Sequence, residues 1–276
     1  SRAISDLSPL SQMARLEVLL AYSNQISDLA PLQGLASLKE LNLHSNDLTG
    51  VQDLTGLTSL TSLNLRSNAI TSVSPLARLT ALQQLSIGNN PIRDHASLAG
   101  LSSLTELGVE DTGMTDASFL SQLPALTKFI AHDNHLTDLS AMAGRTWTSW
   151  GVLDQTAAAH AVVNVPVNLG LKDQRGEAIT VNVLDLPDTV VPLGEQLLFT
   201  APGTYRLPYR ETASGKRAKF AGVITVTVTT QKVTPMPTPT PTPSQSPTPG
   251  ESETPTPAPT RSERPTPTTH APSTST

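Results

Sequence analysis

The sequence predicts an α/β repeat solenoid with short parallel strands and 3₁₀ or irregular backs, followed by a small all-β sandwich and a disordered tail. Three observations lead to this prediction. A leucine-based phrase recurs every 22 residues from about residue 4 to residue 144. Apolar residues then alternate with a period of two up to about residue 230, and the remainder is rich in proline, threonine and serine. We therefore expect domains over residues 1–150, 151–231 and 232–276.

The repeat is clearest where LKELNLHSN begins at Leu38, LTSLNLRSN at Leu60 and LQQLSIGNN at Leu82. The pattern L-x-x-L-x-L-x-x-N with a period of 20–29 residues is the leucine-rich-repeat signature. Its two-residue step predicts a short strand, because side chains of a strand alternate between two faces. The three-residue steps suit a 3₁₀ turn, since so short a unit leaves little room for an α-helix. One unit cannot close a core alone, so neighbouring units must stack.

Two polar positions also recur, and we interpret both as structural. The asparagine that ends each phrase can donate and accept hydrogen bonds with one amide, which suits the backbone of a closing bend. An aspartate two residues after an Ile, Leu or Met can accept hydrogen bonds from the N–H groups of the next turn. The asparagines are Asn24, Asn46, Asn68, Asn90 and Asn134. The aspartates are Asp6, Asp28, Asp94, Asp116 and Asp138.

The fifth unit departs from the pattern. Thr112 replaces the closing asparagine, and His95 and Ala117 stand where other units carry Leu or Val. Phe119 can refill the volume that the small Ala117 leaves. Two interpretations stay open: a tolerated irregularity, or a local bend or bulge used in recognition.

Side chains between the buried leucines of each strand are predicted to point to the concave surface. Because adjacent strands stack about 4.8 Å apart, these side chains form a strip that is mixed in charge and modestly apolar at its ends. This composition fits recognition of a protein better than recognition of nucleic acid or membrane. The predicted partner-binding residues are Tyr22, Glu40, Asn42, His44, Asn64, Arg66, Gln84, Glu106, Glu110, Lys128, Ile130 and His132.

Composition argues against several other classes of protein. The chain carries a net charge of −5 without a visible basic stripe, which disfavours a nucleic-acid binder. No apolar run approaches the ~18–20 residues of a membrane span, so we expect no membrane insertion. The absence of cysteine excludes a disulfide framework and a thiolate site.

No catalytic motif accompanies the repeats. His-Glu-x-x-His, Gly-x-Ser-x-Gly and phosphate-loop patterns do not occur, so we predict neither enzyme activity nor a cofactor. His132, Asp133 and His135 are close in sequence and could form a weak metal site, but we interpret Asp133 and His135 as flanking the structural Asn134 on an exposed bend. His44 and His132 are four units apart, about 19 Å at the strand spacing, and cannot share a metal. We therefore predict no metal site.

Beyond the repeats, Trp147 and Trp150 are predicted to seal the end of the solenoid. Several short strands without a helical pattern then argue for a small β-sandwich. The tail cannot form a core, and its alternating prolines favour an extended stalk of about 120 Å, at ~3.1 Å per residue over roughly 40 residues. The predicted strands cover residues 161–167, 179–185, 196–200, 203–207 and 220–228.

With the phrase ISDLAPL at Ile26, the chain resembles the bacterial internalin-type leucine-rich-repeat proteins over residues 4–230. The resemblance implies that an Ig-like β domain follows directly on the solenoid, with residues 219–226 as its closing strand. It also implies a protein that Gram-positive bacteria secrete or attach to their surface, and that binds other proteins through the concave face.

The chain departs from that family at its ends. The helical N-terminal cap typical of the family is missing, so we expect the start to be truncated. No sorting signal of the Leu-Pro-x-Thr-Gly type is present, because LPDTV at Leu186 ends in valine. A wall-spanning stalk would place an anchor beyond Thr276.

We therefore expect a monomeric, non-enzymatic protein-binding module of the bacterial cell surface, secreted or associated with the cell wall. Its role would be adhesion or ligand recognition through the concave face. The alternative is a passive structural spacer or scaffold of the cell envelope without a specific ligand. A third possibility is an intracellular repeat protein of the phosphatase-regulator type, which the β domain and the stalk disfavour.

Overall fold

Buried leucines at the centre of each repeat phrase set the positions of the first strands. The computed structural model describes residues 3–179, 186–211 and 219–230. Leu41, Leu63 and Leu85 are almost fully buried, while the residues on either side of each are more exposed, because consecutive strand residues point to opposite faces. The strands are β1 (Val18–Leu20), β2 (Glu40–Asn42), β3 (Ser62–Asn64), β4 (Gln84–Ser86), β5 (Glu106–Gly108) and β6 (Lys128–Ile130).

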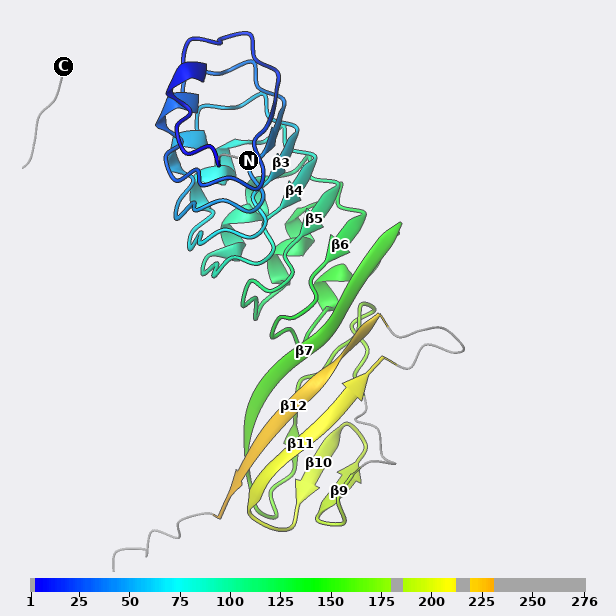
Figure 1. Ribbon diagram of the computed structural model, residues 1–276. Coiled ribbons are helices and arrows are strands. Elements are labelled where there is room, and N and C mark those ends of the chain that lie inside the picture. The colour runs from blue at the N-terminus through cyan, green and yellow to red at the C-terminus, as the bar shows by residue number, and fades with distance from the viewer. Residues whose placement is uncertain (1–2, 180–185, 212–218, 231–276) are drawn as a thin grey trace, which may run out of the picture. The chain divides into compact units, whose positions relative to one another are not determined.

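These strands pair in parallel, and each is in register with the next. Leu19 lies beside Leu41, and Leu41 lies beside Leu63. The same register continues to β6, so residues one repeat apart lie side by side, as the sequence period predicts. Figure 1 shows β3 to β6 stacked along the solenoid.

The return path of each unit is a 3₁₀-helix, which confirms the prediction from the three-residue spacing. Pro9, Pro31 and Pro75 lie at the start of three of these helices, where a fixed φ and a missing N–H fit a helix beginning. No α-helix occurs within the three described ranges. The 3₁₀-helices are η1 (Ser8–Leu10), η2 (Ala30–Leu32), η3 (Gln52–Leu54), η4 (Ser74–Arg78), η5 (His95–Gly100), η6 (Ser118–Gln122) and η7 (Ser140–Met142).

The asparagine ladder has the structural role that its chemistry predicts. Asn46 Nδ2 donates to the carbonyl oxygens of Ala21 and Leu43, each at 3.0 Å. Its Oδ1 accepts a hydrogen bond from the N–H of Ile26, also at 3.0 Å. The later ladder asparagines make the equivalent bonds. Each amide therefore joins its own unit to the preceding one.

The aspartate row behaves as predicted with one exception. Asp28 Oδ1 accepts a hydrogen bond from the N–H of Ala30 at 2.9 Å, and three other members of the row accept from the residue two positions ahead. Asp94 instead accepts from the N–H of Val73 in the preceding unit, at 2.8 Å. Burial works to raise the pKa of Asp94, but hydrogen bonds from Ser72 and from the backbone outweigh it and lower that pKa.

In the irregular fifth unit, a contact between His95 and Thr112 takes the place of the ladder bonds. His95 is 9% exposed, and its Nε2 lies 3.0 Å from Thr112 Oγ1, which donates to the Val109 carbonyl oxygen at 2.9 Å. Burial lowers the pKa of His95 to about 4. Phe119 is buried in the same core as Ala117. The irregular residues therefore compensate one another within the interior.

One long strand, β7 (Ser149–Val162), joins the repeats to the β-rich part of the chain. Its first residues pair in parallel with β6, and most of its length pairs in parallel with β12 (Phe220–Thr229). On its other side β12 pairs antiparallel with β11 (Gly203–Arg210). A single sheet therefore runs from β1 to β7 and on through β12 to β11; Figure 1 shows it from β3 onward.

A second, smaller sheet is antiparallel. Its order is β8 (Val167–Asn168), β10 (Gln196–Phe199) and β9 (Val190–Leu193). Phe199 of β10 is fully buried, and its ring centroid lies 5.0 Å from that of Tyr205 in β11. The two sheets therefore pack against each other around aromatic side chains.

The prediction of one strand over residues 161–167 was wrong. β7 ends at Val162, a turn follows in which Asn164 has a φ of 61°, and β8 begins only at Val167. Asparagine tolerates this left-handed conformation better than most residues. Residues 180–185 of the predicted strand 179–185 lie outside the described residues. The predicted strands at 196–200, 203–207 and 220–228 are confirmed as β10, β11 and β12.

The predicted boundary at residue 150 falls inside β7. Residues on both sides of it belong to one compact unit, because β7 contributes hydrogen bonds to the repeats and to the β-rich part alike. The predicted stalk over residues 232–276 lies outside the described residues.

Candidate protein-binding face

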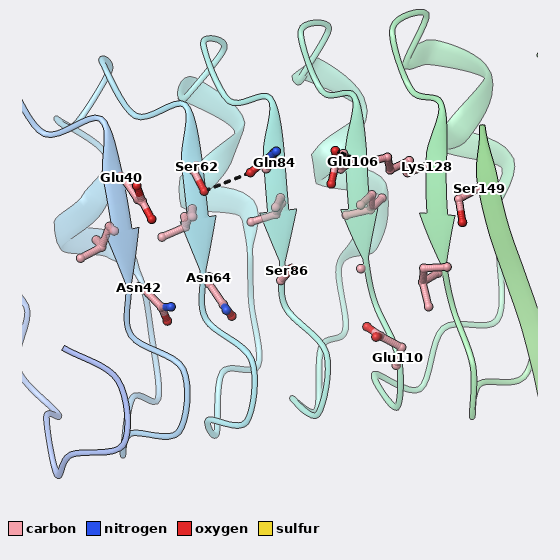
Figure 2. A pocket seen from close by; sticks show the side chains of 16 residues that line it. Glu40, Asn42, Ser62, Asn64, Gln84, Ser86, Glu106, Glu110, Lys128 and Ser149 are labelled. Carbon is pink, nitrogen blue, oxygen red and sulfur yellow. Dashed lines mark hydrogen bonds and ion pairs between the residues drawn. The ribbon is translucent and has the colours of Figure 1, made fainter. Parts of the chain in front are cut away.

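Residues that flank the central leucine of each strand project onto one open face of the sheet. On this face a groove of about 320 Å³ runs across β2 to β6 and reaches β7 (Figure 2). Its floor is formed by the central leucines, and its walls carry polar and charged side chains. Among the predicted residues, those that line the groove are Glu40, Asn42, Asn64, Gln84, Glu106, Glu110, Lys128 and Ile130.

The other predicted residues lie beside the groove rather than in its lining. They are Tyr22, His44, Arg66 and His132, which follow β1, β2, β3 and β6 in the chain. Residues that line the groove but were not predicted to bind a partner are Ser62, Ser86, Gly108 and Ser149. Small side chains give little signal in a sequence, although their size determines where the groove is deep.

An ion pair crosses the middle of this face. Arg66 Nη1 lies 2.6 Å from Glu110 Oε1, although the two residues are two repeats apart. Gly88 stands between them in the intervening unit, and a Cβ atom there would lie only 2.8 Å from Glu110 Oε2. Glycine at this position therefore makes room for the Glu110 side chain, which is 18% exposed.

A second ion pair lies at the rim of the groove. Lys128 Nζ of β6 lies 2.5 Å from Glu106 Oε1 of β5, across one strand spacing. Both side chains are more than a third exposed, so the pair contributes little to stability. It does, however, hold the charges of both residues in place beside the groove.

Two asparagines of the groove are anchored through one end of the amide. Asn42 Oδ1 accepts from the N–H of His44, and Asn64 Oδ1 accepts from the N–H of Arg66, each at 3.1 Å. Each NH₂ group keeps its capacity to donate hydrogen bonds. The two side chains therefore present oriented donors on the open face.

The two histidines of the face are held by backbone groups. His132 Nδ1 accepts a hydrogen bond from the N–H of Leu153 at 3.0 Å, which places the proton of the neutral ring on Nε2. His132 also lies against Gly151, where a Cβ atom would be 2.8 Å from the ring. His44 Nδ1 lies 3.3 Å from the Arg66 carbonyl oxygen and 3.0 Å from Ser45 Oγ. Within the described residues, no three His, Asp or Glu side chains gather in a way that could hold a metal ion.

The first strand gives the face an apolar end. Val18, Leu20 and Tyr22 are 49%, 56% and 52% exposed, whereas the equivalent positions of β2 to β5 are polar or glycine. Figure 1 places this coil at the N-terminal end of the stack. The face thus changes from apolar at β1 to polar at β2 to β5.

At the other end of the repeats, Gln155 acts as a final member of the ladder. Its Oε1 accepts from the N–H of Leu136 at 3.0 Å, and its Nε2 donates to the carbonyl oxygens of Ala131 and Leu153. Sequence analysis missed this role because glutamine replaces asparagine and the repeat spacing is interrupted. The only signal was its position, close to one repeat after Asn134.

No helix in the described part of the chain has the length and apolar character needed to cross a bilayer. Comparison with curated proteins finds no match. The family of Leucine Rich repeats (2 copies) matches residues 14–57, 36–78 and 58–100.

Two solved structures show more closely which leucine-rich-repeat proteins the chain resembles. Internalin C2 from Listeria monocytogenes is 40% identical, and the match covers 55% of this chain and 67% of that chain with a TM-score of 0.52. An internalin (inlF) from the same organism is 27% identical over 56% of this chain and 53% of that chain, with a TM-score of 0.51. Together with the parallel register, the 3₁₀ returns and the asparagine ladder, these matches show that the chain belongs to the internalin-type leucine-rich-repeat proteins.

Proposed function

We propose that the chain is a non-enzymatic protein-binding module of the bacterial cell surface, and that it recognises its partner through the open face of β1 to β6. The observation that carries this proposal is the groove itself. Its polar side chains stand on a hydrogen-bonded sheet and are held by ion pairs and backbone contacts. Such preorganised groups lose little conformational entropy when they bind.

The composition of the face supports a protein partner. Exposed apolar side chains at β1 lie next to amides, carboxylates and amines on the later strands, and protein interfaces combine such an apolar part with polar surroundings. In this proposal the β-rich part, residues 151–231, is an Ig-like domain that supports the solenoid rigidly, and residues 232–276 are a stalk. The protein acts as a monomer that is secreted or associated with the cell wall.

The test compares the immobilised wild-type chain with a variant that blocks the groove. Ser62→Lys and Gln84→Lys place two long cationic side chains on adjacent strands, at positions that face each other in the register. Surface proteins retained by the wild-type chain should be retained at least about tenfold less, a loss of about 1.4 kcal/mol. Quantitative mass spectrometry of the retained proteins measures this difference.

The matched control adds the same charge outside the face. Thr80→Lys and Ser102→Lys alter exposed residues that do not line the groove, and this variant should retain the same proteins as the wild type. Identical retention by all three proteins would exclude the open face as the binding site. Retention of no surface protein, together with co-fractionation with peptidoglycan, would favour the passive spacer.

A further inference from the structure

Between β4 and β5, three residues of the open face lack large side chains. Ser86 and Gly108 line the groove, and the buried Gly88 lies beside them. The same positions in the neighbouring units carry Asn64, Arg66 and Ile130. The small residues therefore leave space in a face that is otherwise covered by longer side chains, and the Glu110 side chain fills part of it. We refer to Ser86, Gly88 and Gly108 as the β4–β5 hollow.

One carboxylate reaches into the β4–β5 hollow. Figure 2 shows the Glu110 side chain pointing from the end of β5 toward the side of β4. Its Oε1 is bound by Arg66 Nη1 at 2.6 Å. Its Oε2 faces the glycines, since a Cβ atom would lie 2.8 Å from it at Gly88 and 3.1 Å from it at Gly108.

The second oxygen of Glu110 retains most of its hydrogen-bonding capacity. A carboxylate offers about four acceptor positions, and within the residues the structure describes only Oε1 takes part in an ion pair. The side chain is 18% exposed, so solvent screens it less than a fully exposed carboxylate. A donor entering the hollow would meet a carboxylate oxygen that Arg66 holds in place and that is partly shielded from solvent.

The charges that line the groove favour a cation over an anion. Glu40, Glu106 and Glu110 line it, whereas Lys128 is its one cationic lining residue among those described. Lys128 is already bound to Glu106 at 2.5 Å, and the nearby Arg66 is bound to Glu110. The two ion pairs cancel in charge, so the Glu40 carboxylate is the excess charge among the described lining residues, and it favours an incoming cation over an incoming carboxylate.

We propose that the β4–β5 hollow receives a basic side chain, with arginine preferred, from an extended segment of a protein partner, and that Glu110 Oε2 is its acceptor. The guanidinium is planar and donates several hydrogen bonds in a fixed geometry, which suits a carboxylate held from one side. The amide of Asn64 and the hydroxyl of Ser86 lie on the same face and orient the backbone of the segment. This assignment rests on the proposed function and names the chemistry that the partner must supply.

The probe is a short Gly/Ser peptide with one central arginine, titrated into the full isotopically labelled chain and followed by NMR. The amide signals of Gly88 and Gly108 should shift in a saturable way, and matched peptides with norleucine or glutamate at the central position should bind at least about tenfold more weakly, or by about 1.4 kcal/mol. Equal shifts with the arginine and norleucine peptides, or tighter binding of the glutamate peptide, would overturn the assignment.

Two variants locate the contact. Glu110→Gln keeps the shape of the side chain and removes its charge, so the arginine peptide should bind about tenfold more weakly. Gly108→Ala keeps the charge and fills the hollow, with the same expected loss. Glu17→Gln removes one carboxylate from an exposed pair with Lys39, away from the groove, and should change nothing. Unaltered binding by Glu110→Gln and Gly108→Ala would rule the hollow out.

The outcome is separable from that of the proposed function. If Ser62→Lys with Gln84→Lys abolishes capture of surface proteins but Glu110→Gln leaves it unchanged, the open face is the binding site and the β4–β5 hollow is not its basic-residue pocket. If neither variant changes capture, the open face itself is not the site.

Discussion

At the scale of single residues, polar groups inside the solenoid contribute to its stability alongside the leucines. Each ladder asparagine satisfies backbone groups of two units at once, and a buried polar group without a partner would cost about 1–3 kcal/mol. Where Thr112 interrupts the ladder, its hydroxyl lies near Val109, His95 and Asn134 and does not make the ladder's bonds to the preceding unit. His95 supplies the missing hydrogen-bond partner from the helix side of the same unit.

This compensation makes stability depend on pH. His95 is neutral in the folded chain because burial lowers its pKa to about 4, against the opposing effect of Asp94, whereas the unfolded chain binds the proton at its usual pKa of about 6.5. Between these values the unfolded state holds more protons, so the free energy of unfolding falls as pH decreases from about 6.5 to 4, by up to about 3 kcal/mol. Below the folded pKa the loss is complete.

His95→Val isolates that contribution, since valine occupies the equivalent position at Val51 and Val73. Urea unfolding between pH 4 and 7 should give a flatter stability profile for this variant than for the wild type. His160→Ala, at an exposed histidine, should keep the wild-type slope. An unchanged slope in His95→Val would show that other groups cause the pH dependence.

The leucines, the asparagines and most of the aspartates could be assigned from the sequence because each repeats at the same spacing. The pairing of His95 with Thr112, and that of Arg66 with Glu110, could not. These contacts join single residues from different strands or turns, and no period marks them. The sequence alone does not explain why residue 88 is a glycine. The structure explains it, because the Glu110 side chain lies across this position.

At the scale of elements, β7 is the strand that the sequence did not reveal. Its middle is rich in alanine, which has little preference for strands, and Asp154 interrupts the alternation with a φ of 57°. The strand forms because β6 and β12 offer hydrogen-bonding partners on its two sides, and β12 begins far along the chain. Local pattern cannot report such distant partners.

The pairing of β7 with β12 contains an irregularity between Phe220 and Gly222. A Cβ atom at Gly222 would collide with the Gln155 carbonyl oxygen and lie 2.8 Å from Tyr209 Oη. Because these atoms belong to the backbone and to a buried ring, Gly222→Ala should lower the free energy of unfolding by about 1–3 kcal/mol. Thermal or urea unfolding measures the loss.

Gly34→Ala is the matched control, because no atom lies within 4 Å of a Cβ built there. It should change stability by less than about 0.5 kcal/mol. If the two alanine variants were equally stable, the close approach of β7, β11 and β12 at Gly222 would not be required by the fold.

At the scale of the whole described unit, one continuous sheet links the open face of β1 to β6 to the β-rich part. At the β11 edge of this sheet, Pro208 and two arginines are features that discourage pairing with another chain.

Contacts across the junction should couple local opening of the last repeat to local opening of the β-rich part. Tyr209 of β11 is buried and donates a hydrogen bond to the Leu136 carbonyl oxygen in the last repeat, at 2.9 Å. Tyr209→Phe keeps the ring and its edge contact with Phe220 but removes that bond, at a cost of about 1 kcal/mol. Amide hydrogen exchange should become about fivefold faster on both sides of the junction, in β6 and β7 as well as in β11 and β12.

Tyr205→Phe provides the comparison, because the same substitution on the same strand removes a bond to the Ala201 carbonyl oxygen that lies wholly within the β-rich part. Its effect on exchange should not extend to β6. If Tyr209→Phe also left β6 unchanged, the repeats would open independently of β11 and β12, and residue 150 would mark a true boundary between folding units. Faster exchange in β6 with Tyr209→Phe, but not with Tyr205→Phe, would instead mean that the bond between Tyr209 and Leu136 couples the last repeat to β11.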